Sequence, residues 1–160
     1  MKRLVIFLAL IALLSCSCQQ KYDILDYQGG NIEAHCTVNE KYSVVIKSNK
    51  EALTLEIVEP VRLKGVTFQI GNEVYASVND VKIKIKPEQI KGICALCHMF
   101  SLEEETMTAA EKNGEGSELT FLDSYGAYTL TLGKGSVPSR VIINGEKYSY
   151  NVIIDGIKIE

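Results

Sequence analysis

The run Cys94-Ala95-Leu96-Cys97-His98 places two thiols and an imidazole close together in the chain. This is the spacing of a c-type haem attachment site, in which the cysteines bond to the haem vinyl groups and the histidine ligates the iron. Met99 is too near the motif to fold back as the second axial ligand, so Met107 or His35 would have to supply it. One functional hypothesis is therefore an electron-transfer protein that carries haem c.

The same cysteines also fit other roles. Free cysteine is among the most buried residue types, so Cys94 and Cys97 are most simply core residues. A disulfide between them would restrain little, whereas one from Cys36 to either would tie a strand to a helix. Zinc bound by Cys36, Cys94, Cys97 and His98 lacks a recognisable second pair of ligands. We therefore expect these cysteines to be core thiols or to form one disulfide, and we expect no metal ion. We expect no catalytic residue either, because no hydrolase signature is present.

A further cysteine lies behind an apolar segment at the N-terminus. Lys2-Arg3 is followed by the uncharged run Leu4 to Leu14, which is far shorter than the roughly 20 residues of a membrane span. Leu13-Leu14-Ser15-Cys16 then resembles a bacterial lipobox, and it fits better than the alternative at Cys18. The sequence predicts a signal peptide over 1–15 and fatty acylation of Cys16. The mature chain would be lipid-anchored on the extracytoplasmic side of the cell membrane.

The charge balance of the mature chain limits its partners. Loss of Lys2 and Arg3 from 17 basic residues leaves 15 against 20 acidic ones, a net charge of −5. Such a surface gives no reason to expect nucleic acid. Residues 16–30 have the composition of a tether, and 31–160 is long enough for one domain with its own core.

Apolar and polar residues alternate through most of that domain, as in half-buried strands. Strands are expected over 32–38, 42–47, 53–59, 66–70, 74–78 and 81–85, and again within 119–121, 128–132, 137–143 and 148–154, with Ile157 and Ile159 closing the chain. Gly71-Asn72 predicts a two-residue hairpin turn, and Asn79-Asp80 and Asn144-Gly145 predict further turns. Lys82, Lys84 and Lys86 form the polar side of one strand.

Between the two groups of strands the period changes. An apolar stripe at spacings of three and four predicts one amphipathic helix that begins near Pro87; its members are Ile90, Ile93, Cys94, Cys97 and Phe100. Residues 101–112 fit either an extension of the helix or a short strand. The expected fold is mainly β (α+β), with eight to ten strands in a curled antiparallel sheet or incomplete β-barrel under one covering helix. A two-sheet sandwich is the second choice.

Two stretches suggest a family. Leu55-Glu56-Ile57-Val58-Glu59-Pro60 leads into Leu63-Lys64-Gly65-Val66, and Val137-Pro138-Ser139-Arg140 comes before the last strand pair. Together they resemble the LolA/LolB-type lipoprotein-carrier fold and its small lipoprotein relatives. The resemblance implies an unclosed barrel with a helical lid that holds acyl chains or docks an envelope protein. The lipobox, the one-sided strands and the single covering helix favour a non-enzymatic binding module with no cofactor beyond the lipid on Cys16. The resemblance assigns no particular binding residue.

Overall fold

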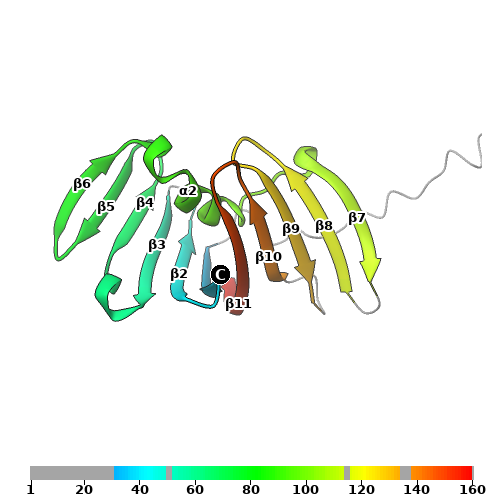
Figure 1. Cartoon of the computed structure of the whole chain (residues 1–160), viewed down its shortest axis with the longest axis horizontal. Coiled ribbons are helices and arrows are strands. Elements are labelled where there is room, and N and C mark those ends of the chain that lie inside the picture. The colour runs from blue at the N-terminus through cyan, green and yellow to red at the C-terminus, as the bar shows by residue number, and fades with distance from the viewer. Residues whose placement is uncertain (1–30, 50–51, 114–115, 134–137, 160) are drawn as a thin grey trace, which may run out of the picture.

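The computed structural model describes residues 31–49, 52–113, 116–133 and 138–159 (Figure 1). The first six strands are β1 (Ile32–Val38), β2 (Tyr42–Ser48), β3 (Leu53–Glu59), β4 (Thr67–Ile70), β5 (Val74–Val78) and β6 (Val81–Ile85). The last five are β7 (Met107–Asn113), β8 (Gly116–Leu122), β9 (Ala127–Leu132), β10 (Pro138–Asn144) and β11 (Ser149–Ile159). The predicted signal peptide, the tether and the acylated Cys16 lie outside the described residues.

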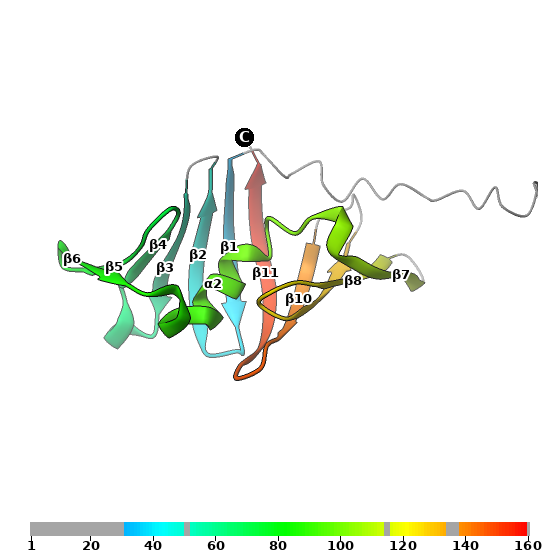
Figure 2. The same ribbon diagram turned by 90° about the horizontal axis from the view of Figure 1, so that it is seen from above.

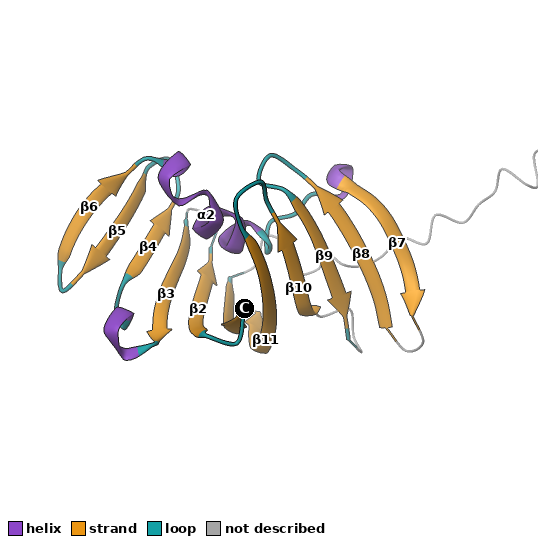
Figure 3. Cartoon of the chain, in the orientation of Figure 1, coloured by secondary structure: helices purple, strands orange, loops and turns teal. Residues whose placement is uncertain are grey.

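All eleven strands belong to one antiparallel sheet, in the order β6-β5-β4-β3-β2-β1-β11-β10-β9-β8-β7. Each half of the sheet is a meander, and the pairing of β1 with β11 joins the halves, with Ala34 opposite Ile157. The outermost strands β6 and β7 lie at opposite ends of the curled sheet, so the barrel is not closed (Figures 1 and 3). The curled sheet is confirmed, and the sandwich is wrong.

One side of the sheet, termed the core face, carries the hydrophobic core. On β1, Ile32, Ala34, Cys36 and Val38 are at most 3% exposed, because alternate side chains of a strand point to the same face. The pattern continues across the sheet to Val152 on β11. The opposite side, termed the outer face, is polar, as expected for an antiparallel sheet with one solvated face.

The single described α-helix, α2 (Lys91–His98), lies over the middle strands of the sheet (Figure 2). A 3₁₀ turn, η2 (Pro87–Ile90), comes before it, so the predicted helix begins with a tighter turn than expected. Proline at the first position suits this start because its missing N–H has no partner there in any helix. Residues 94–97 are all buried, so the C-terminal half of α2 is enclosed by the rest of the fold. No helix of the described residues is long and apolar enough to span a membrane.

The structure decides three local predictions, of which only the two-residue turn at Gly71-Asn72 is wrong. Residues 101–112 do not prolong the helix; they contain the 3₁₀ turn η3 (Glu104–Thr106) and most of β7, which raises the strand number to eleven. The β4–β5 loop has three residues rather than two, because Ile70 pairs with Val74. Asn79 and Asp80 do form a two-residue turn, since both have positive φ and Val78 pairs with Val81.

Candidate functional site

An apolar pocket lies between α2 and the core face of β1 to β3. Its volume is about 250 Å³, and its walls are Val38, Tyr42, Val44, Leu55, Ile57, Ile93, Leu96 and Tyr150. The strands supply the floor because their core-face residues alternate in register, with Val44 opposite Ile57 and Ile46 opposite Leu55. The only polar atoms on these side chains are the two tyrosine hydroxyls. Such a hollow suits a narrow apolar group better than a polar one.

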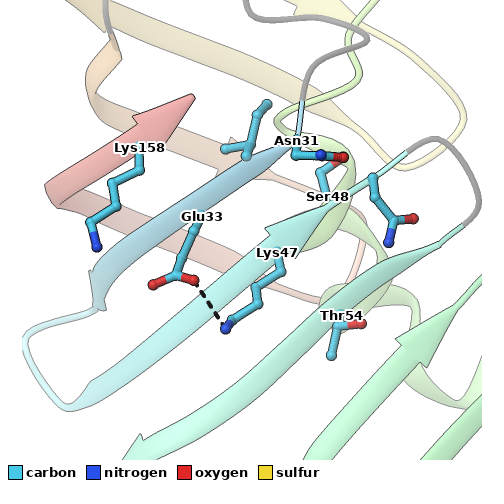
Figure 4. Close-up of a pocket in the computed structure, with 8 residues that line it drawn as sticks. Asn31, Glu33, Lys47, Ser48, Thr54 and Lys158 are labelled. Atoms are coloured by element: carbon cyan, nitrogen blue, oxygen red, sulfur yellow. Dashed lines mark ion pairs between the residues drawn. The ribbon is translucent and has the colours of Figure 1, made fainter. Parts of the chain in front are cut away.

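A larger pocket, of about 400 Å³, lies at the ends of β1, β2 and β11 and has a different character (Figure 4). Glu33, Lys47 and Lys158 line it, and Lys47 Nζ is 3.0 Å from Glu33 Oε2. The Lys47 ammonium lowers the pKa of the Glu33 carboxyl. Glu33 and Lys47 already form an ion pair with each other at this surface, so the apolar pocket is the better candidate site.

Close packing of the helix shapes the apolar pocket. Gly92 lies so near Tyr150 that a Cβ at residue 92 would be 2.3 Å from Tyr150 Oη. The Tyr150 ring stacks on Tyr148 at 5.5 Å between centroids, and Tyr148 Oη donates a 2.6 Å hydrogen bond to the carbonyl of Tyr125. Burial raises the pKa of Tyr150, so its phenol stays neutral at the pocket wall.

All three cysteines of the described residues are free thiols and all are buried. Cys94 and Cys97 are 3% and 0% exposed on α2, and Cys36 is 2% exposed on β1. Burial raises the pKa of Cys36 to about 12 and also raises that of Cys97. Thiols in this protonated state are poor nucleophiles and poor metal ligands. Nor does any group of three His, Cys, Asp or Glu residues in the described part of the chain fit a metal ion.

The haem hypothesis gains no support from this geometry. Both nitrogens of the His98 ring face protein groups: Nε2 is 3.0 Å from Asp123 Oδ2, and Nδ1 is 2.9 Å from Ser101 Oγ. Cys97, whose sulfur would carry a thioether, has no exposed surface. A haem would therefore need both the helix face and the His98 ring to move. His35, one of the two proposed axial ligands, is exposed on the outer face beside Glu33.

Ser101, His98 and Asp123 line up in the order of a hydrolytic triad, which the sequence did not predict. Activation of a serine also needs N–H donors for the oxyanion. Here the backbone N–H groups of Phe100 and Ser101 already donate to the carbonyls of Cys97 and His98. Ser101 Oγ also lies 3.2 Å from the His98 carbonyl, at the negative end of the helix dipole. The geometry fits a link between α2 and the β8–β9 turn.

Asp123 holds that link in place. Its Oδ1 accepts hydrogen bonds from the backbone N–H groups of Tyr125 (2.7 Å) and Gly126 (3.1 Å), which fixes the turn. Its Oδ2 faces His98 but accepts no aligned hydrogen bond from the described residues. Tyr128 Oη is likewise buried without a hydrogen-bond partner in the described structure. Sequence patterning identified Asp123 only as a turn residue, because its contact with His98 spans 25 positions.

Comparisons with known proteins support the fold. The chain is similar to an uncharacterised conserved protein from Thermus thermophilus, with a TM-score of 0.53 and 16% identity over 89% of this chain and 88% of the other. This likeness shows a shared fold.

Two further solved structures give lower scores. A putative outer membrane lipoprotein-sorting protein domain from Vibrio parahaemolyticus has a TM-score of 0.49, with 12% identity over 88% of this chain and 90% of the other. A LolA superfamily protein from Nitrosomonas europaea has a TM-score of 0.44, with 12% identity over 88% and 91%. No family model matches the chain, and no curated protein matches it.

The architecture confirms the resemblance to the LolA/LolB-type fold. The Pro60-to-Gly65 element contains the 3₁₀ turn η1 (Val61–Leu63) and leads into β4. Gly65 has φ +82°, a conformation that favours glycine. β10 begins at Pro138 and pairs with β11, the strand that joins the two halves. The unclosed sheet and its covering helix complete the predicted arrangement.

Proposed function

We propose that this protein is a membrane-anchored lipoprotein that binds an apolar ligand, the acyl chain of a lipid, in the pocket under α2. The observation that carries the proposal is the composition of that pocket, whose walls are six aliphatic side chains and two tyrosines. A hydrocarbon chain gains free energy on leaving water, about 0.8 kcal/mol for each buried methylene. The pocket contains no charged side chain that would oppose this.

The size of the pocket indicates which part of a lipid fits. At about 250 Å³ it lies just below the range typical of sites for drug-sized ligands. One acyl chain, or part of one, suits this volume, whereas a whole phospholipid does not. Binding needs no reaction, which agrees with buried neutral thiols and with backbone N–H groups already bonded at Ser101.

Native mass spectrometry of the full chain, released from detergent micelles, tests the proposal. We expect a lipid-sized mass that is lost on denaturation and is distinct from the detergent. A haem-sized mass that survives denaturation would instead establish the haem hypothesis. An acyl mass that survives denaturation and disappears in Cys16→Ala would establish the anchor separately.

Matched variants locate the ligand. Ile93→Glu places a carboxylate at the pocket wall and should abolish the adduct, because burial of an unpaired charge is costly. Leu122→Glu makes a similar change at a residue that is 58% exposed and outside the pocket, so the adduct should persist. A wild-type chain without any lipid adduct, or an adduct unaffected by Ile93→Glu, would contradict acyl binding in this pocket.

A further inference from the structure

Strand β6 is the edge strand of the sheet that comes just before η2 and α2 in the chain. Its backbone pairs with β5 along one edge only, and no strand of the described residues pairs with its other edge (Figure 1). Its inner side pairs with β5 from Val74 opposite Ile85 to Val78 opposite Val81. An unpaired edge presents backbone N–H and C=O groups to which another strand can bind. The side chains on β6 therefore decide which strand is accepted.

The core face of β6 is apolar and remains open. Val81 and Ile83 are each 57% exposed, and Val78 beside them on β5 is 41% exposed. In register these residues continue the apolar surface that begins with Leu55 and Phe68 under α2. An incoming strand with apolar side chains on the same face would extend the core sideways.

The outer face of β6 is basic. Lys82 Nζ donates a 3.0 Å hydrogen bond to Gln69 Oε1 and lies 4.1 Å from the centroid of the Tyr75 ring. Lys84 pairs with Glu73. Within the described structure no carboxylate lies in ion-pair distance of Lys82, so its positive charge is held in place and uncompensated.

These lysines disfavour a second copy of β6 as the partner. If two copies paired antiparallel about Ile83, Lys82 of each would lie opposite Lys84 of the other, and no carboxylate would be brought opposite Lys82, because Glu73 already pairs with Lys84. Like charges directly opposite one another on paired strands are destabilising. A strand with acidic residues on that face would instead form cross-strand ion pairs.

We propose that β6 is a docking edge for an extended segment of another protein in which acidic and apolar side chains alternate. The segment would pair with β6 by strand addition, with backbone hydrogen bonds for affinity and alternate side chains for selectivity. Its apolar side chains would cover Val81 and Ile83, and an acidic side chain would face Lys82. This edge is separate from the pocket under α2, and the inference does not depend on the pocket's ligand.

A labelled heptapeptide of alternating glutamate and valine is the probe. We expect the fluorescence anisotropy of the peptide to rise when the full chain in detergent micelles is added. Binding should also slow hydrogen exchange of the backbone amides of residues 81–85. A peptide of the same composition with its glutamates and valines in two separate blocks should not bind. Absence of binding by the alternating peptide, or equal binding by both peptides, would overturn the proposal.

Charge variants add a matched test. Lys82→Glu should weaken binding of the glutamate–valine peptide about fivefold to tenfold, and it should create binding of an alternating lysine–valine peptide. Lys112→Glu makes the same charge change on β7 at the other edge and should leave the affinity unchanged. Unchanged thermal unfolding shows that both variants are folded. An affinity for the glutamate–valine peptide that is unchanged in Lys82→Glu would refute the proposal. A dimer of the wild-type chain in sedimentation experiments, with the amides of residues 81–85 protected from hydrogen exchange, would also refute it.

Discussion

Gly92 on α2 and Tyr150 on β11 are packed so closely that residue 92 has no room for a side chain. A Cβ there would lie 2.3 Å from Tyr150 Oη and 3.1 Å from Tyr150 Cζ. Tyr150 also forms part of the wall of the apolar pocket. The glycine therefore sets how near the helix comes to the sheet and how wide the pocket is.

Gly92→Ala should change ligand binding more than stability. Alanine favours a helix by about 1 kcal/mol over glycine, which offsets part of the cost of moving the Tyr150 ring. We expect the free energy of unfolding to stay within about 1 kcal/mol, while the native mass spectra show much less lipid adduct. Gly156→Ala is the control, because a Cβ at residue 156 meets no atom within 4 Å. An unchanged adduct in Gly92→Ala would show that the contact does not shape the pocket.

Asp123 should stabilise the fold through both of its oxygens. Asp123→Ala removes the acceptor for the backbone N–H groups of Tyr125 and Gly126 and should cost about 2 kcal/mol in urea unfolding. Asp123→Asn keeps an acceptor oxygen and loses only the charge that faces His98, so it should cost less. Equal losses in the two variants would assign the whole effect to the charge.

Tyr128→Phe should leave stability unchanged or raise it. The Tyr128 side chain is fully buried, and its hydroxyl has no hydrogen-bond partner among the described residues. A buried polar group without a partner carries a desolvation penalty of about 1–3 kcal/mol, which phenylalanine avoids. Urea unfolding measures the difference. A loss above about 1 kcal/mol would mean that the hydroxyl does form a hydrogen bond in solution.

Stability should fall in alkaline solution because of the buried thiols. Burial holds the pKa of Cys36 at about 12 in the folded chain, against an ordinary value of 9.0. The contribution is complete below pH 9.0, where both states keep the proton, and it is lost as the pH rises toward about 12. The free energy of unfolding that the Cys36 thiol contributes in this way is at most about 4 kcal/mol. Urea unfolding across this range should show a smaller decline in Cys36→Ala, and an equal decline would exclude Cys36 as a source.

Thiol labelling checks the burial directly. Cys36, Cys94 and Cys97 should resist a thiol reagent in the folded chain and react once urea unfolds it, because none is more than 3% exposed. Mass mapping of the labelled peptides separates them from Cys16 and Cys18. Fast labelling of Cys97 in the native state would contradict its position in the core.

The sequence alone determined ten of the eleven strands, the single described helix and the one-sided core. Alternation with period two identified the four buried residues of β1, and the change of period at Pro87 located the helix, because both signals act between near neighbours in the chain. The same local pattern correctly grouped Cys94 and Cys97 with the apolar stripe. It could not separate strand from helix over 101–112, where β7 forms by pairing with β8.

Only the tertiary structure decided the sites. The pocket joins Val38, Ile57, Ile93 and Tyr150, whose neighbourhood depends on how α2 crosses the curled sheet. The contact between His98 and Asp123, and the open outer side of β6, likewise depend on strand order and helix position. Sequence periodicity reports which face a residue occupies, and it contains no information on which distant residue lies opposite. For that reason the spacing of Cys94 to His98 suggested a haem site from the sequence alone, whereas no local sequence pattern predicted the pocket beside it.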